Sequence, residues 1–553
     1  MTSLNTSRHR LRQLLRRGAI GCVVAACFAP SVCLAQSAPI KTLPADPSRP
    51  VVLTYQRQIN GNIAVSQVVS TVSATSGNAP PIAPVSVTTT VVPLGVFLSS
   101  PVHYLWNGFL TMQNVVGMLN RSGTPLDLTV RMLDQDGSEL SATALQVPPN
   151  GEYDLAVNLL PGFRVNALGV LQVEFAGNAF DGNGFFYRYA KDGRTLEFMT
   201  GAPFESRLLG PSFASYNTIQ PSRRTTQLAN EVTSWLAVSN LNQTAEKDFT
   251  VELYDQSGNL VQSKKLTVPP RGRRDVSAGH ENPGPGHVGL IRIVPADNNS
   301  AYTASIIRYG ASAPSSALAK FYHFSVLTPA QRASSTFEWG QISRGGDGEN
   351  WVVLSNTSNT AGDFNLSFRS NSGAQLGDMN VHLNGFAQIH LFANGLLAPA
   401  ESGVVKVTAL TPNSFVAESD FYFYDRANGE LTAAYSSLFR RPTNADNIGS
   451  YNTFLGQYNY LKAFNVNDVG GATTVNNVTI SQSSGSAIGS ADIALAPEQG
   501  LELALHDLPF APASGSYGPI SLTDPTLSVI ADVLRLQYSV DGKIKGIQSL
   551  PLR

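Results

Sequence analysis

The chain is poor in cysteine. Three cysteines occur in 553 residues, and all of them (Cys22, Cys27 and Cys33) lie in the first 35 residues. If that segment is removed on export, the remaining chain can form no disulfide, thiolate metal site or cysteine nucleophile. Its stability must then come from hydrophobic cores, which domains of more than about 100 residues can supply.

The chain also lacks an excess of positive charge and long apolar runs. The first 35 residues hold five of the 38 Lys and Arg residues and no Asp or Glu, so the remainder has 33 basic against 39 acidic residues and a net charge of −6. This thinly spread charge argues against nucleic acid as a partner. No later stretch reaches the roughly 18 apolar residues that cross a bilayer, so we expect no transmembrane span in the mature chain.

Residues 1–35 have the pattern of a signal peptide. Five arginines precede a mostly apolar segment (18–34), and Ala35-Gln36 fits a cleavage point. Two alternatives stay open: a lipoprotein box that would leave Cys27 lipidated, and twin-arginine export through Arg16-Arg17. We predict export from a bacterial cell to the periplasm, the outer surface or the medium.

One pattern of about 115 residues occurs four times after residue 100. The distance from its third glycine to its tyrosine is 20, 20, 21 and 20 residues, which indicates an array of like domains. The landmarks are an asparagine (Asn120, Asn240, Asn356, Asn465), a turn glycine (Gly137, Gly258, Gly373, Gly485), a second glycine (Gly151, Gly272, Gly385, Gly500), a third glycine (Gly169, Gly289, Gly403, Gly518) and a tyrosine (Tyr189, Tyr309, Tyr424, Tyr538). We expect the asparagine to bond its own backbone and to start the turn that follows.

Each copy has the alternation of an all-β fold. In the second copy Phe249, Val251 and Leu253 alternate with polar residues, and a turn at 255–258 follows. Seven short strands per copy predict four tandem immunoglobulin-like or fibronectin-like antiparallel β-sandwich domains. An outer-membrane barrel is the competing fold, but its repeat would be a single hairpin.

The repeat register sets the expected domain boundaries. They are 1–35 for the signal peptide, 36–100 for a Ser/Thr/Pro-rich leader, and 101–220, 221–333, 334–442 and 443–553 for the four sandwiches. The leader is expected to be flexible, that is extended or partly disordered, or to donate a strand from Thr88–Val92. Linkers near 220–224, 331–334 and 440–443 carry arginines, which are solvated linker charges or form a basic stripe for an acidic polymer.

Few residues are candidates for a site. Trp106 and Trp339 lie outside the repeated apolar positions, in the entry strand or at the junction between units. They are the candidate binding residues, as platforms for sugar rings, and packing at the junction is the alternative that we favour. Trp235 and Trp351 occupy a repeated position and are expected in the cores. Asp134-Gln135-Asp136-Gly137 resembles a calcium loop, but the other copies lose its carboxylates, which favours a hairpin turn. No motif predicts a catalytic, cofactor-binding or metal-binding residue.

The layout predicts a non-enzymatic function. Disulfide-free sandwiches on short linkers would make a semi-rigid rod, which suits an adhesion, scaffold or spacer protein at the cell surface or in the periplasm. Its partner would be a protein or a polysaccharide, bound through loops such as His280–Gly286 and Phe510–Tyr517. A polysaccharide-binding protein that uses Trp106 and Trp339, and a hydrolase, are the alternatives. Edge strands could also add a strand from a second molecule, so self-assembly stays open.

Overall fold

The computed structural model describes three strands between residues 51 and 91 and most of residues 101–553. Within the latter range it leaves out residues 191–192, 194, 205–206, 220–230, 313–320, 346–347, 412–413, 426, 428, 430, 443–445, 468–470, 472 and 540–541. The expected signal peptide and the linker at 220–224 therefore lie outside the described residues. Residues 101–553 belong to one compact unit.

The leader contains a small antiparallel sheet. Its order is β1 (Val51–Ile59), β2 (Asn62–Ser70), β3 (Ser86–Val91), and β3 includes most of the segment expected to favour a strand.

Residues 101–553 form four repeats of eight strands each, one strand more than expected. The first repeat contains β4 (Val102–Asn107), β5 (Gln113–Asn120), β6 (Leu126–Asp134), β7 (Glu139–Val147), β8 (Glu152–Ala156), β9 (Leu168–Phe175), β10 (Phe180–Tyr189) and β11 (Leu196–Pro203). The second contains β12 (Ser212–Asn217), β13 (Glu231–Asn240), β14 (Lys247–Asp255), β15 (Leu260–Val268), β16 (Arg273–Ser277), β17 (Val288–Pro295), β18 (Tyr302–Ser312) and β19 (Phe321–Pro329). Strand β12 precedes residue 220, yet it pairs within the second repeat.

The third and fourth repeats follow the same plan. The third contains β20 (Phe337–Ser343), β21 (Gly348–Asn356), β22 (Gly362–Ser370), β23 (Gln375–Leu383), β24 (Gln388–Phe392), β25 (Ser402–Ala409), β26 (Phe415–Tyr424) and β27 (Leu431–Leu438). The fourth contains β28 (Asp446–Asn452), β29 (Tyr458–Asn465), β30 (Thr474–Ser481), β31 (Ala487–Leu495), β32 (Gly500–Ala504), β33 (Tyr517–Thr523), β34 (Val529–Tyr538) and β35 (Ile544–Pro551). Short 3₁₀ turns are η1 (Phe109–Thr111), η2 (Val157–Leu159), η3 (Ala393–Gly395), η4 (Phe454–Gly456) and η5 (Leu505–Asp507), and the described residues contain no α-helix.

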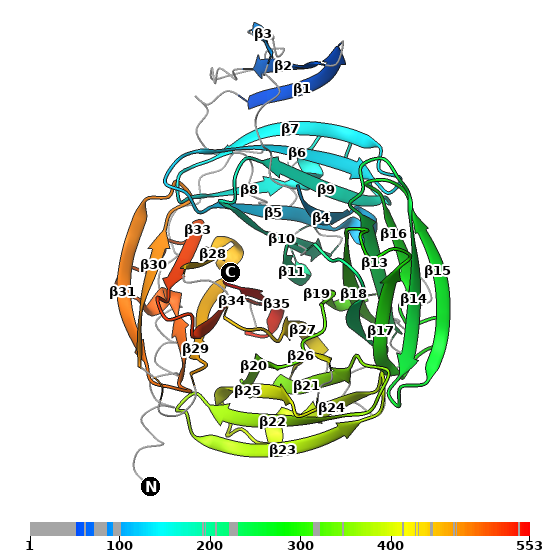
Figure 1. Ribbon diagram of the computed structural model, residues 1–553. Coiled ribbons are helices and arrows are strands. Elements are labelled where there is room, and N and C mark those ends of the chain that lie inside the picture. The colour runs from blue at the N-terminus through cyan, green and yellow to red at the C-terminus, as the bar shows by residue number, and fades with distance from the viewer. Residues whose placement is uncertain are drawn as a thin grey trace. The chain divides into compact units, whose positions relative to one another are not determined.

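Each repeat folds into two four-stranded antiparallel sheets. With the strands of a repeat numbered 1 to 8, one sheet has the order 1-6-3-4 and the other 8-7-2-5 in all four copies. In Figure 1 the 1-6-3-4 sheets form the perimeter, so we call them outer and the others inner. The immunoglobulin constant order shares the 2–5 and 3–6 pairs, but its first strand pairs with the second rather than the sixth.

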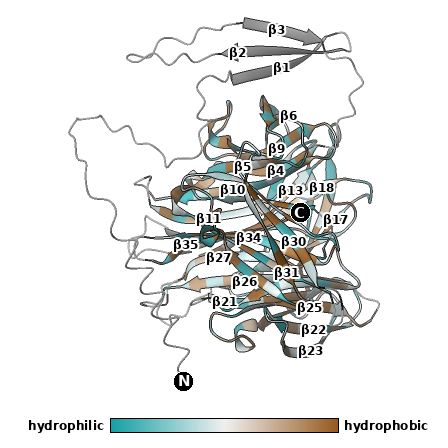
Figure 2. Cartoon of the chain, turned by 90° about the vertical axis from the view of Figure 1, so that its left-hand side faces the viewer, coloured by the Kyte–Doolittle hydropathy of each residue, from teal (hydrophilic) through white to brown (hydrophobic). Residues whose placement is uncertain are grey.

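The apolar alternation in the sequence fills the space between the two sheets of each repeat. On β14, Phe249, Val251 and Leu253 are each 1% exposed and face the core of the second repeat. Burying one such side chain contributes roughly 1.5–3 kcal/mol. Brown and teal segments accordingly alternate along the strands in Figure 2. Equivalent cores occupy the other three repeats.

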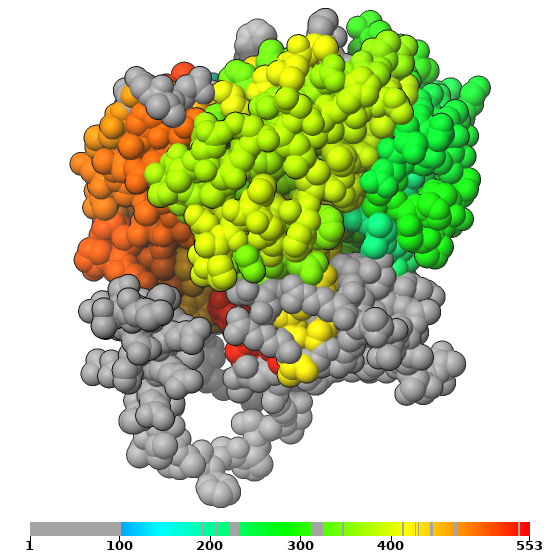
Figure 3. All heavy atoms as spheres, turned by 90° about the horizontal axis from the view of Figure 1, so that it is seen from below, coloured from blue at the N-terminus to red at the C-terminus, as the bar shows by residue number. Residues whose placement is uncertain are grey.

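The expected rod is wrong, because the four repeats close into a ring. The last strand of each repeat lies at the centre of Figure 1, where β11 contacts β19 and β35, and β27 contacts the same two strands. Figure 3 shows the third repeat between the second (green) and the fourth (orange). The physical reason is burial on both faces: along β27 six of eight side chains are buried, whereas a free two-layer sandwich would leave alternate residues in water.

Turns on the outer side complete the ring. The hairpin that carries the turn glycine of one repeat docks on the turn before the fifth strand of the next, and the fourth repeat docks on the first in the same way. The backbone bonds are Arg273 N to Gln135 O (2.9 Å), Gln388 N to Gln256 O (3.0 Å), Gly500 N to Asn371 O (2.9 Å) and Glu152 N to Ser483 O (3.0 Å). These bonds make the closure between the fourth and first repeats equivalent to the other three junctions.

The expectation for the repeated asparagine is confirmed. Asn240 is 1% exposed; its Nδ2 donates to three backbone carbonyls, and its Oδ1 accepts from the Asn242 N–H at 2.9 Å. Asn120 and Asn356 form the same set of bonds, and Asn465 Oδ1 accepts from the Asn467 N–H. One side chain therefore ends a strand and begins the next turn in each copy.

Two of the three glycine landmarks are equivalent in all copies. The turn glycines have φ between 80° and 90°. The third glycines lie where a neighbouring carbonyl leaves no room for a Cβ, such as Leu133 O beside Gly169. The second landmark is wrong in two copies, because the position that matches Gly151 and Gly272 holds Ala387 and Gln499. The tyrosine landmark is wrong in the second copy, where Tyr309 matches Tyr187 rather than Tyr189.

Candidate binding cavity

A cavity of about 810 Å³ lies where the four central strands end and the segments between repeats begin. Its walls come from all four repeats: the ends of β11, β19, β27 and β35, and the segments 327–335 and 436–442. Residues far apart in the sequence thus share one site because the ring closes.

The backbone around the cavity is held by short β-bridges. Gln331 pairs with Phe213, and Arg440 pairs with Trp339, in both cases through two N–H···O bonds of 2.8–2.9 Å. Arg553 bonds Ile448 in the same manner, at 2.9 and 3.1 Å. The second residue after each of these central strands is therefore fixed, and the side chains of Gln331, Arg440 and Arg553 line the cavity from three repeats.

The lining is strongly basic. It contains five arginines (Arg207, Arg332, Arg440, Arg441 and Arg553) and, among the described lining residues, one acidic side chain. Arg440 forms an ion pair with Asp532 at 2.8 Å. Arg441 donates to Phe337 O and Ser334 Oγ, and Arg332 donates to Arg207 O. Bonds to these neutral oxygens do not neutralise the guanidinium charges, and one acidic side chain faces five arginines among the described lining residues, so the cavity favours an anion.

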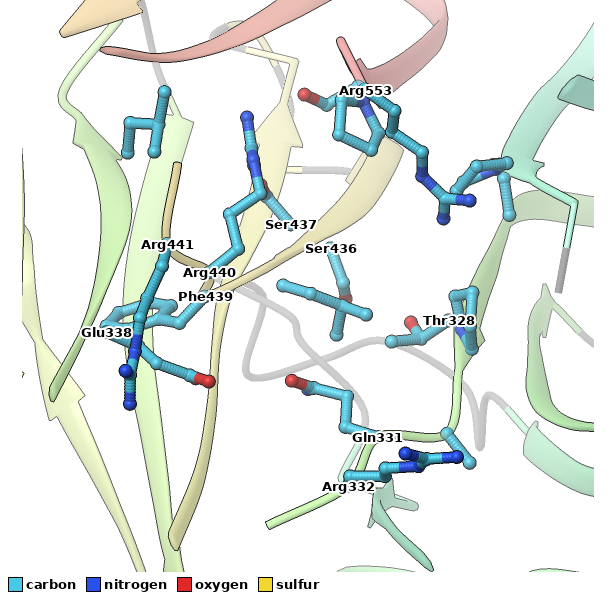
Figure 4. Close-up of a pocket in the computed structure, with 18 of the residues that line it drawn as sticks. Thr328, Gln331, Arg332, Glu338, Ser436, Ser437, Phe439, Arg440, Arg441 and Arg553 are labelled. Carbon is cyan, nitrogen blue, oxygen red and sulfur yellow. The ribbon is translucent and has the colours of Figure 1, made fainter. Parts of the chain in front are cut away.

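The acidic side chain is Glu338 on β20. Its Oε2 atom is buried and makes no hydrogen bond within the described part of the chain. Burial raises the pKa of Glu338 to about 7, although Arg441 and Ser334 act in the opposite direction. In Figure 4 the side chains of Glu338 and Gln331 point toward one another.

The two tryptophans predicted to bind are not exposed. Trp106 is 0% exposed, and its Nε1 donates to Leu133 O at 2.8 Å inside the first repeat. Trp339 is 1% exposed and packs near Phe464 between the third and fourth repeats. A sugar-stacking platform needs an open ring face. Neither indole has one in this structure.

Trp235 and Trp351 are half-buried, and they lie between repeats rather than in the sandwich cores. Trp235 packs against the cluster shared by the first and second repeats, and Trp351 against the one shared by the second and third. Their position faces away from the outer sheet of its own repeat, which is why apolar character alone did not distinguish core from interface.

Exposed aromatic rings cluster instead in the fourth repeat. Tyr458 is 43% exposed and Tyr538 39%, with ring centroids 5.5 Å apart. The His506 ring lies 5.0 Å from Tyr458. We call Tyr458, Tyr538 and His506 the aromatic cluster; none of the three lines the cavity.

The segment that resembles a calcium loop is a hairpin turn, as expected. Asp134 Oδ1 accepts from the N–H groups of Asp136 and Ser138, both at 2.9 Å. Asp136 forms an ion pair with Arg274 of the second repeat at 2.7 Å. Among the described residues no group of three or more His, Cys, Asp or Glu side chains is arranged to hold a metal. The carboxylates therefore serve the turn and the junction.

Sequence reasoning found part of the cavity. Arg332, Arg440 and Arg441 lie in two linkers noted for their arginines, and the structure brings these linkers together. Arg207, Arg553 and Glu338 were missed. The predicted binding loops, His280–Gly286 and Phe510–Tyr517, do not line the cavity.

Comparison with protein-family models finds no match, and no curated protein matches the chain in sequence. No helix of the described residues is long and apolar enough to cross a membrane.

Proposed function

We propose that the protein is an exported, non-enzymatic binding scaffold whose ring of four repeats holds an anionic ligand in the central cavity. The observation that carries the proposal is the convergence of five arginines from all four repeats on one cavity. The fold proposal is that each repeat is an elaborated immunoglobulin-like or fibronectin-like sandwich, supported by the shared 2–5 and 3–6 strand pairs. Export is supported by the pattern of residues 1–35.

Arginine suits such a site for two physical reasons. Its guanidinium group presents a rigid set of donors that matches carboxylate, phosphate and sulfate oxygens. Ion pairing is also stronger in a partly enclosed cavity than on an open surface, since solvent screens it less. The rest of the chain carries net negative charge, so the basic lining is local.

A hydrolase remains the less favoured function. Glycoside hydrolysis commonly uses two carboxyl groups about 5–10 Å apart. Glu338 is the single acidic side chain among the described residues that line the cavity. The proposal therefore assigns binding rather than hydrolysis to this site.

The test is a calorimetric titration with inorganic tripolyphosphate at low and high salt. Arg332→Gln/Arg441→Gln should bind at least about 10-fold more weakly, because hydrogen bonds to charged groups contribute about 1.5–3 kcal/mol each. Lys264→Gln/Lys265→Gln, on β15 of the second repeat, removes the same charge away from the cavity and should bind like the wild type. Equal affinity of the two double variants would contradict the proposal, as would an absence of binding to the wild type. Fractionation of the native cell tests export: the mature protein should be absent from the cytoplasm.

A further inference from the structure

Glu338 is out of place in a cavity for a bare polyanion. Its carboxyl group lies beside Arg441 and repels a ligand that carries only negative charge. Its buried Oε2 atom lacks a hydrogen-bond partner within the described residues. The Glu338 side chain as a whole is partly exposed and lines the cavity, so it presents a carboxylate acceptor to a ligand that brings a hydrogen-bond donor.

The rest of the wall is rich in groups that both donate and accept. Thr328, Ser334, Ser437 and Ser549 bring hydroxyl groups to the lining from three repeats. Gln331 adds an amide on the side that faces Glu338. Apolar residues lie between these groups, so a ligand in contact with the walls meets hydrogen-bonding groups at several separate points of its surface rather than at one charged end.

The volume of the cavity limits the size of the ligand. About 810 Å³ falls in the range of about 300–1,000 Å³ typical of sites for organic ligands. A single phosphate or sulfate would leave most of the polar wall without contact. The ligand is therefore an organic molecule that carries several hydrogen-bonding groups.

We propose that the cavity binds an acidic saccharide, with its carboxylate on the guanidinium groups of Arg332 and Arg441 and its hydroxyl groups donating to Glu338. The inference rests on the proposed anion-binding function and names the ligand class for the same site. Glu338 is then a specificity-determining residue: it selects for hydroxyl donors next to the anionic group and against anions without donors.

This arrangement predicts effects of opposite sign for one substitution. Glu338→Leu removes the acceptor and the negative charge together. The saccharide loses a charge-assisted hydrogen bond, which outweighs the relief of repulsion on its carboxylate. Tripolyphosphate donates no sugar hydroxyl group to Glu338, so it loses no such hydrogen bond in Glu338→Leu. The substitution then removes only the repulsion, and tripolyphosphate should bind more tightly. Glu338→Gln keeps an acceptor oxygen and should give a smaller loss with the saccharide.

The experiment titrates the full-length protein at pH 8 with three probes: trigalacturonate, its carboxyl-reduced neutral form, and inorganic tripolyphosphate. For the wild type we expect trigalacturonate to bind more tightly than either other probe. In Glu338→Leu its affinity should fall about 10-fold while that for tripolyphosphate rises several-fold. Tyr458→Ala/Tyr538→Ala, in the aromatic cluster, should leave trigalacturonate affinity unchanged, and thermal unfolding should show that every variant is folded at the temperature of the titration.

Each contrary result has a separate meaning. If Glu338→Leu strengthens both anions, the cavity binds bare polyanions, so this inference fails and the proposed function stands. If no anion binds the wild type, both fail. If loss of the aromatic cluster abolishes saccharide binding while Glu338→Leu does not affect it, the saccharide binds on the fourth repeat and the inference is wrong.

Discussion

Two interfaces of the ring use equivalent strands but different side chains: the interface between the second and third repeats, and the interface between the third and fourth. At three equivalent positions the first has Arg308, Asp420 and Tyr422, and the second has the apolar set Phe421, Leu534 and Leu536. The apolar interface is one cluster with Phe421 stacked on Tyr435 at 4.4 Å.

The charged interface is fully buried and joined by hydrogen bonds. Arg308 Nη2 donates to the Tyr422 hydroxyl at 3.0 Å, and that hydroxyl donates to Asp420 Oδ2 at 3.2 Å. Ser436 also donates to Asp420, and the Arg308 guanidinium lies over the Tyr422 ring. The backbone register is the same in both interfaces. The strand arrangement therefore determines the ring, and either a hydrogen-bonded polar network or an apolar cluster can fill an interface between repeats.

A second difference concerns an acid shared by both interfaces. Asp532 and Glu418 occupy equivalent positions, but Asp532 pairs with Arg440 whereas the residue that matches Arg440 near Glu418 is Gln331. Burial, followed by repulsion from Asp420, raises the pKa of Glu418 to about 8. Burial and the neighbouring Asp420 thus keep this acid protonated near neutral pH, although the Arg308 guanidinium acts on its pKa in the opposite direction.

The largest expected effect comes from removing one partner of the charged network. Arg308→Met leaves Asp420 buried without its counter-charge and should lower the free energy of unfolding by about 3–5 kcal/mol. The matched control is Arg308→Phe/Asp420→Leu/Tyr422→Leu, which copies the neighbouring interface and should be near neutral or stabilising. Urea unfolding followed by circular dichroism measures both. A triple variant less stable than Arg308→Met would mean that the two interfaces are not interchangeable.

This comparison also shows what the sequence could and could not predict about the fold. The sandwich cores, the asparagine and the turn glycines follow from local signals: alternation, side-chain bonds to nearby backbone, and positive φ. Ring closure was missed because the central strands contain small residues such as Ala433 and Ala434, which pack closely but do not form a strong apolar pattern. The second glycine was mismatched because the positive φ falls on Asn150, Arg271, Phe386 and Glu498 instead, which are four different residue types.

The site could be predicted only in part for a related reason. Arg332 and Arg441 are charged linker residues in the sequence, and only the closed ring makes them neighbours of one cavity. Glu338 gives no signal, since a single acid in a strand forms no motif. Trp339 packs at a junction between repeats, which was the alternative favoured over a sugar platform. The burial of Trp106 inside the first repeat could not be predicted, because it depends on Gly169, which pairs with Trp106 across the outer sheet. Such long-range pairings are not visible in sequence spacing.

The next prediction concerns a feature in which the second and third repeats do not differ. Asn240→Ala and Asn356→Ala each remove three hydrogen bonds to backbone carbonyls, and each should cost about 1–3 kcal/mol of unfolding free energy. The two costs should agree, and neither variant should alter tripolyphosphate binding. Gln243→Ala, at an exposed side chain near Asn240, is the control and should be neutral. Lost binding at an unchanged melting temperature would give the asparagine a functional role instead.

A smaller change in the free energy of unfolding, on the order of 1 kcal/mol, is expected when the pH is varied. The folded pKa of Glu418 is raised above 4.5, so its contribution to stability is complete below about pH 4.5 and is lost as pH rises through about 8. Burial lowers the pKa of His390 to about 4, so the His390 contribution is complete above pH 6.5 and is lost as pH falls through about 4. Between pH 6.5 and 8.5 the contribution of His390 is constant, whereas Glu418 and Glu338, whose pKa burial raises to about 7, both change theirs. A comparison of the wild type with a Glu418 variant isolates the part that belongs to Glu418.

Glu418→Gln should therefore lose less stability than the wild type from pH 6.5 to 8.5, as measured by melting temperature. Glu281→Gln, at an exposed carboxylate, should follow the wild-type curve. Parallel curves for the wild type and Glu418→Gln would show that Glu418 is not a buried acid that stays protonated.

The smallest effect on the free energy of unfolding is expected at an exposed ion pair, in contrast to the buried pair Arg308–Asp420. Asp136 and Arg274 join the first and second repeats at 2.7 Å, but their side chains are 57% and 35% exposed. Because water and salt screen such a pair, Asp136→Asn should cost less than about 1 kcal/mol, and the difference should vanish in 1 M salt, where the Debye length is about 3 Å. The backbone bond from Arg273 N to Gln135 O remains and keeps the two turns together. If Asp136→Asn instead cost as much as Arg308→Met, charge pairing on the outer side of the ring, rather than burial at its centre, would hold the repeats in place.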